Sequence, residues 1–138
     1  MTTLHDQWTA LYAAGRVRWM PGMSDGCYRV THSPSEDGEW VDVTCDGRSF
    51  ECRLSELTEP DFSDPATIGC LLHQAREAWN DKGLTVVGEF VPPFAPSWRA
   101  MGGHLHGAGF QRLAMIGHDS EPAAILAAIA AAPPKVNP

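Results

Sequence analysis

Lysine is scarce in this sequence, and the signals of several protein classes are missing. The 138 residues include only two lysines, and the formal net charge is −7. Neutralising the phosphates of a nucleic acid requires clustered lysine and arginine, so direct binding of DNA or RNA is not expected. No apolar run reaches the 18 residues that predict a membrane-spanning helix. The N-terminus lacks the basic and apolar stretches of a signal peptide, which predicts a cytoplasmic protein.

Motifs for catalysis and for cofactor binding are also missing. The four cysteines form no C-x-x-C pair, so neither a zinc ribbon nor a thioredoxin-like site is indicated, and we expect buried or half-buried free thiols. The chain has no G-x-S-x-G nucleophile elbow and no phosphate-binding glycine loop of the P-loop or dinucleotide type. The sequence therefore assigns no catalytic residue and no cofactor, and a non-enzymatic protein is predicted.

What the chain does have is a strongly localised negative charge. Ten of its 17 acidic residues lie between Glu36 and Asp64, where the only bases are Arg48 and Arg53. Ten acids minus two bases give this segment about −8, and the rest of the chain sums to about +1. A clustered negative field attracts cations and basic protein surfaces and repels nucleic acid.

Part of this segment has the pattern of a β-hairpin. Asp46-Gly47 is a strong hairpin turn signal, and apolar residues alternate with polar ones on both sides of it. The carboxylates then lie in loops and on the outward face, beside a large aromatic side chain of the type enriched at binding hot spots. The predicted partner-binding residues are Glu36, Asp37, Glu39, Trp40, Asp42, Asp46 and Glu51. The alternative is a solvated face that keeps the protein soluble and protects a sheet edge.

The first part of the chain predicts a small β-rich module over residues 1–62. A short opening helix is expected over residues 4–14, because apolar residues recur at helical spacing. Four strand-like segments follow at residues 16–20, 27–32, 39–45 and 48–54, separated by turn residues. This spacing resembles that of SH3-like barrels, although other antiparallel meanders would give the same pattern.

The second part predicts an α–β–β–β–α module over residues 63–132, followed by a flexible tail at 133–138. Asp64 is a good N-cap, Pro65 suits the first helical position, and an apolar stripe runs on to Trp79. Strands are expected at residues 84–91, 97–101 and 110–116, and Ser120 is expected to cap the last helix. The predicted class is α+β, with the β-meander packed on an antiparallel sheet that two helices cover.

The two helices of this second part resemble those of small proteins encoded by tailed phages and prophages. The segment Ser63–Leu72, which closes in Ala78-Trp79 and Gly83, and the final run from Pro122 to Ala128 are similar to the phage α/β/α sandwich domain. The similarity covers roughly the last 75 residues. It implies a phage accessory protein and carries no catalytic residue to this chain.

A histidine-rich segment supports an alternative function. His104 and His106 lie at i and i+2 in a glycine-rich stretch, and His118-Asp119 follows. If the stretch is extended, the first two imidazoles face the same side and could hold one metal ion. His118 or Asp119 would then complete the site of a metal-dependent enzyme.

The sequence thus leads to one preferred hypothesis and several alternatives. The preferred one is a phage-encoded binding protein that acts in the host cytoplasm and uses its acidic surface to inhibit or redirect a host nucleic-acid-handling or defence complex, as anti-CRISPR proteins do. The expected partner is a host protein or complex with a basic surface, with no direct nucleic acid, no membrane and no metal. The alternatives are the metal-dependent enzyme, a virion structural or assembly component, and an interaction module of another kind. The oligomeric state is left open.

Overall fold

The computed structural model describes residues 2–90, 96–103 and 106–134. Four α-helices and two antiparallel sheets confirm the α+β class within that part of the chain. The chain divides into two compact units, Val17–Cys70 and Met1–Arg16 with Leu71–Pro138, which are described separately below. Helix α1 therefore belongs with the C-terminal half, and the modules 1–62 and 63–132 stay a prediction about the sequence. None of the helices in the described residues is long and apolar enough to cross a membrane.

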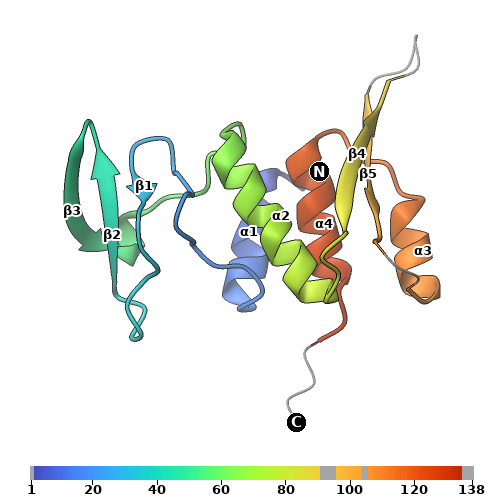
Figure 1. Cartoon of the computed structure of the whole chain (residues 1–138), viewed down its shortest axis with the longest axis horizontal. Helices are drawn as coiled ribbons and strands as arrows, with labels where there is room; N and C mark the ends of the chain where they lie inside the picture. Colours follow the sequence, from blue (N-terminus) through green and yellow to red (C-terminus); the bar gives the residue numbers. More distant parts are fainter. Residues whose placement is uncertain (1, 91–95, 104–105, 135–138) are drawn as a thin grey trace. The chain divides into compact units, whose positions relative to one another are not determined.

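The unit Val17–Cys70 is built on a three-stranded antiparallel sheet in the order β1-β2-β3 (Figure 1). The strands are β1 (Arg29–Val30), β2 (Trp40–Cys45) and β3 (Arg48–Arg53), and a 3-10 turn, η1 (Leu54–Glu56), follows. As predicted, Asp46-Gly47 forms the β2–β3 turn, and both residues have the positive φ that a type I′ turn requires. Val30, Val41 and Val43 are almost fully buried on the inner face.

Two of the four strands expected in this unit are shortened or absent. The segment 27–32 contributes only Arg29–Val30, and the segment 16–20 forms no strand. Val17 and Trp19 are buried and Arg18 is exposed, so this segment has the alternating burial of a strand without sheet pairing. The backbones of Gly22 and Met23 bond to Val30 instead and cover the outer edge of β1.

The second unit places helix α4 (Glu121–Ala131) against helix α1 (Leu4–Ala13), strands β4 (Thr85–Glu89) and β5 (Ser97–Met101), and helix α3 (Ala108–Ala114). Ile125, Leu126 and Ile129 on α4 are almost fully buried, and they form the centre of this core. Helix α2 (Pro65–Trp79) has the predicted bounds. The indole N–H of its Trp79 donates to the carbonyl of Ala128 at 2.7 Å.

The prediction of a third strand in this half, at residues 110–116, is wrong. Residues 108–114 form helix α3, so the order is α–β–β–α–α. Phe110 and Leu113, three positions apart, are both buried, whereas Ile116, which a strand would place on the same face as Phe110, is exposed. The apolar spacing was therefore helical, and seven residues are too few for periodicity alone to separate the two structures.

Candidate functional site

The outer face of the β2–β3 hairpin carries the central residues of the predicted binding surface. In the β2–β3 register, Trp40 lies opposite Arg53, Asp42 opposite Glu51, and Thr44 opposite Ser49. Directly opposed residues in an antiparallel pair project to the same face. The hairpin thus brings Asp42 and Glu51, nine positions apart in the sequence, side by side on a face where both are exposed.

Asp42 and Glu51 occupy the closer of the two kinds of cross-strand pair. The carbonyl of Asp42 accepts a hydrogen bond from the backbone N–H of Thr31, so the backbone of Asp42 faces β1 and turns away from β3. The Asp42–Glu51 pair is therefore not bonded through its backbone groups, and Cα atoms in such pairs lie about 4.5 Å apart. Two carboxylates placed opposite each other in this way destabilise a sheet.

One residue near this pair can offset its charge. Nδ1 of His32 lies 3.5 Å from a carboxylate oxygen of Asp42, and both side chains are largely exposed. His32 compensates the charge only when its ring is protonated. While the ring is neutral, Asp42 and Glu51 present two negative charges to solvent.

Trp40 lies at the end of the same face, with a cation above it. The guanidinium carbon of Arg53 is 5.0 Å from the centre of the Trp40 ring, a cation–π distance. Trp40 is half-buried, and Arg53 is held over it by the register of the hairpin. Trp40 is therefore a positioned aromatic beside the carboxylates, with one side already in contact with a cation.

The loop before β2 presents three further carboxylates on a closed turn. The N–H of Ser35 donates to the carbonyl of Trp40 at 2.9 Å, and the N–H of Gly38 donates to the carbonyl of Ser35 at 2.8 Å. The Asp37 carboxylate accepts from the Ser35 hydroxyl and from the N–H of Glu39, and these bonds lower the pKa of Asp37. Glu36 and Glu39 are exposed on the same turn.

Asp46 is separated from these residues by the length of the hairpin. It lies in the turn beyond the Cys45–Arg48 pair, whereas Trp40 and Arg53 form the last pair at the opposite end. Five residue steps along a strand cover roughly 17 Å. The structure therefore groups six of the seven predicted residues at one end and middle of the hairpin. Trp40, Asp42 and Glu51 lie on the outer face, and Glu36, Asp37 and Glu39 lie in the turn before β2; these six residues together are called the acidic hairpin face.

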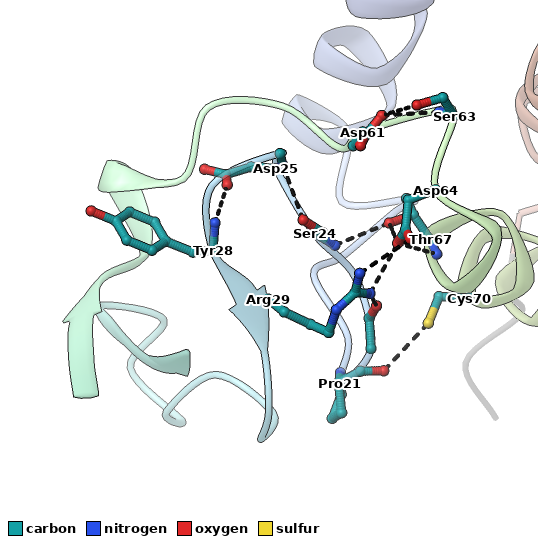
Figure 2. Close-up of polar contacts among 12 residues, drawn as sticks. Pro21, Ser24, Asp25, Tyr28, Arg29, Asp61, Ser63, Asp64, Thr67 and Cys70 are labelled. Carbon is teal, nitrogen blue, oxygen red and sulfur yellow. Dashed lines mark hydrogen bonds and ion pairs between the residues drawn. The ribbon is translucent and has the colours of Figure 1, made fainter. Parts of the chain in front are cut away.

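The last acids of the segment have a structural role instead (Figure 2). Both oxygens of Asp64 accept from the Arg29 guanidinium, at 3.0 and 3.1 Å, and one of them also accepts from the N–H and the hydroxyl of Thr67. The hydrogen bonds from Arg29 are the main reason that the pKa of Asp64 falls to about 2. Thr67 in turn accepts from the N–H of Ser24. Asp64 therefore connects β1 to the start of α2.

Asp25 and Asp61 also bond to nearby backbone. Asp25 accepts from the N–H of Cys27 at 2.9 Å. Figure 2 shows that Asp25 also accepts from the N–H of Tyr28, at 2.8 Å, and that Asp61 accepts from the N–H and hydroxyl of Ser63. Within residues 36–64, Asp61 and Asp64 therefore bond inside the fold, whereas Asp42 and Glu51 are exposed on the hairpin.

The cysteines differ from the expectation at one position. All four lie in the described part of the chain as free thiols, and Cys27 is exposed whereas the others are half-buried or buried. Burial raises the pKa of Cys45, Cys52 and Cys70, which keeps these thiols protonated. A protonated thiol is a poor nucleophile and a poor metal ligand.

The histidines of the alternative site are placed only in part. His104 lies outside the described residues. Nε2 of His106 is 2.8 Å from a carboxylate oxygen of the fully buried Asp81, and its ring packs against Trp79 and Phe110. His118 pairs through its backbone with Trp98 on β5. Among the described residues no three His, Cys, Asp or Glu side chains form a metal-binding cluster.

Sequence reasoning did not single out an aromatic pair on the inner face of the sheet. The rings of Tyr28 and Phe50 meet edge to face at 5.4 Å, and Phe50 is 42% exposed although it lies opposite the buried Val43. With Cys45, Asp46 and Arg48 they line an open depression at the turn end of the hairpin. The only sequence signal was an aromatic residue at an inward position close to a turn.

Comparison with known proteins identifies no relative of this chain. No family model, no curated protein and no solved structure matched it. The acidic hairpin face is therefore the feature from which a function is proposed.

Proposed function

We propose that this protein is a non-enzymatic binding protein that uses the acidic hairpin face to engage a basic surface of another protein. The observation that carries the proposal is the exposed Asp42–Glu51 pair, in which two like charges occupy the closest cross-strand position. Such a pair costs stability in the free protein. A cation from a partner placed between the two carboxylates would relieve that cost on binding.

The neighbouring residues support the same proposal. The turn that carries Glu36, Asp37 and Glu39 is closed by its own hydrogen bonds, so its backbone and the Asp37 carboxylate are held in place before a partner arrives. A positioned surface loses less conformational entropy on association than a mobile one. Clustered charge also speeds association with a basic partner and makes binding sensitive to salt.

The proposed biological setting comes only from the sequence resemblance of the two helices to phage accessory proteins, which stays a prediction. In that setting the partner is a host complex that handles nucleic acid, because such complexes carry the basic channels that an acidic surface complements. The protein would then occupy the channel and inhibit or redirect the complex, as anti-CRISPR and anti-restriction proteins do.

Affinity capture from host lysate at low and high salt tests the proposal. The unmodified chain should retain a partner at low salt and release it as the salt concentration rises. The double variant Asp42→Lys and Glu51→Lys should lose the partner, because it replaces two negative charges with two positive ones. A matched control is Glu89→Lys, which reverses an exposed carboxylate on the other hairpin and should leave capture unchanged.

Two results would count against the proposal. One is a partner retained equally well at high salt, and the other is a double variant that captures as much partner as the unmodified chain. Circular dichroism of each variant shows whether it is still folded, so that loss of binding can be distinguished from unfolding.

The enzyme alternative depends on three histidines, of which only His106 and His118 are described. A binding role for Nε2 of His106 would compete with its contact to Asp81. Elemental analysis of the purified protein tests this alternative, and a particle-incorporation assay tests the virion alternative.

A further inference from the structure

The two edges of the three-stranded sheet differ in whether other backbone of the chain is hydrogen-bonded to them. At the β1 edge, the N–H of Gly22 donates to the carbonyl of Val30 and the N–H of Val30 donates to the carbonyl of Met23, both at 2.8 Å. At the β3 edge, no further strand pairs with β3 within the described part of the chain (Figure 1). The first four residues of β3 are exposed. Edge strands of this kind are templates for pairing with another chain.

The register shows which backbone groups β3 offers. The backbone of Asp42 faces β1, so that of its partner Glu51 faces away from β2. The same alternation turns the backbone N–H and C=O of Ser49 outward. The N–H of Arg53 is bonded to the Glu56 carboxylate at 3.1 Å, which closes that end of the edge. The open part of the edge is therefore Ser49–Glu51.

The side chains beside this open edge differ between its two faces. On the outer face, Glu51 stands next to Asp42, so a residue of an added strand would meet negative charge there. On the inner face, the exposed part of Phe50 would meet an apolar residue. Because successive residues of a strand alternate between faces, the partner segment should alternate basic and apolar residues.

Charge complementarity distinguishes this occupant from a second copy of the same chain. If two copies paired through their β3 edges with Glu51 at the centre, the Glu51 carboxylates of the two copies would lie opposite each other. Each of them already lies beside the Asp42 of its own copy. Like charges directly opposite each other destabilise a sheet. A lysine or arginine at that position would instead lie against two carboxylates.

We propose that the β3 edge at Ser49–Glu51 is a strand-addition site for an extended segment of the partner in which basic and apolar residues alternate. This proposal rests on the proposed function and specifies its partner: the acidic hairpin face binds the basic side chains, and the edge binds the backbone. Backbone pairing supplies affinity, and the two faces supply specificity.

A peptide-binding experiment tests the site without knowledge of the natural partner. The probe is a short fluorescein-labelled peptide in which lysine and valine alternate, and its binding is followed by fluorescence anisotropy at low salt. Control peptides have the same composition with the lysines and valines in two blocks, or the same sequence with N-methyl groups on the backbone. The alternating peptide should bind about tenfold more tightly than either control, because the block peptide cannot place its basic and apolar residues on opposite faces and the N-methylated peptide cannot form the backbone hydrogen bonds.

The matched variants are Ser49→Pro and Ser49→Ala. Proline removes the outward N–H of residue 49 and leaves the bonds between β2 and β3 in place, because that N–H does not face β2. Ser49→Pro removes one backbone hydrogen bond and should weaken binding of the alternating peptide about fivefold, whereas Ser49→Ala should bind it like the unmodified chain.

The possible outcomes distinguish failure of the strand-addition proposal from failure of the proposed function. Equal binding of the alternating, block and N-methylated peptides overturns strand addition, and so does equal binding by Ser49→Pro and Ser49→Ala. If salt-sensitive capture of a host partner persists in either case, the proposed function stands and only the edge proposal fails. Self-association of the unmodified chain that Ser49→Pro abolishes would also overturn it, because the edge would then serve a second copy.

Discussion

The two hairpins of this protein place their charges in opposite ways. In β4–β5, Glu89 and Arg99 lie on opposite strands and form an ion pair at 3.1 Å. In β2–β3, Asp42 and Glu51 lie directly opposite each other with the same sign. Helix α4 packs against β4 and β5, whereas the outer face of β2–β3 is exposed.

The difference separates charge that supports the fold from charge that is left for a partner. Within residues 36–64 the same division recurs, since Asp64 is paired with Arg29 and the carboxylates of the acidic hairpin face are exposed. A sum of charges over the segment hides this division. Only pairing in three dimensions shows which carboxylates remain available.

The largest expected effect concerns the residue that joins the two ends of the β4–β5 hairpin. The buried Asp81 carboxylate accepts from the N–H of Gly83 before β4 and of Gly103 after β5, at 3.0 and 2.8 Å, and also contacts His106. Asp81→Ala removes a buried acceptor and leaves these partly buried donors without a partner, so we expect a loss of about 3 kcal/mol in unfolding free energy and a fall of roughly 10 °C in Tm.

Thermal and urea unfolding measure this effect. The control is Lys82→Ala at the exposed neighbouring position, which should leave the Tm unchanged. If Asp81→Ala melts with the unmodified chain, Asp81 does not join the ends of the hairpin.

The next largest effect is the pH-dependent contribution of Asp64, which pairs with Arg29 in the unit Val17–Cys70, to the unfolding free energy. Because the pKa of Asp64 is lowered from 3.8 to about 2, its contribution is present in full above the unfolded-state value. That contribution is lost as the pH falls from about 4 to about 2. Its size is at most about 2.5 kcal/mol, and solvent screening reduces it because the Arg29 side chain is 43% exposed.

Urea unfolding of Asp64→Asn across this pH range checks the assignment. The variant should be less stable than the unmodified chain at neutral pH, and the difference should shrink below pH ~4. A difference that is constant with pH would show that the loss does not come from the ionised carboxylate.

The smallest expected effect is a change in unfolding free energy on replacing a glutamate by lysine, and its sign should differ between the two hairpins. Glu51→Lys places a cation opposite Asp42 and should raise the unfolding free energy by about 0.5 kcal/mol. Glu89→Lys places a cation beside Arg99 and should lower it by a similar amount, about 0.5 kcal/mol. Both changes should diminish at high salt, and denaturant unfolding at two salt concentrations measures them. The same sign in both hairpins would contradict the proposed difference between them.

Local signals in the sequence predicted a large part of the fold. Asp46-Gly47 predicted the hairpin turn, and the alternation around it predicted which residues share each face. Asp64-Pro65 and Ser120 predicted where α2 and α4 begin. These features could be predicted because the residues that form them are neighbours in the chain.

Features that depend on distant residues could not be predicted in this way. Residues 108–114 form a helix where a strand was expected. So short a segment has too few apolar residues for their spacing to distinguish a helix from a strand, and the packing partners that decide between them are distant in the sequence. Arg29 and Asp64 are 35 positions apart, and Asp81 and His106 are 25 apart. Nothing in the local spacing of these residues indicated that they meet.

The sequence alone determined the α+β class, the position of the β2–β3 hairpin and the concentration of negative charge in residues 36–64, because each depends on local pattern or composition. The tertiary structure decided which carboxylates are neutralised by a partner such as Arg29 and which oppose each other on an exposed face. It also decided which sheet edge is covered by the chain's own backbone. The physical reason is that an electrostatic interaction or a backbone hydrogen bond depends on distance in space, which residue order does not contain.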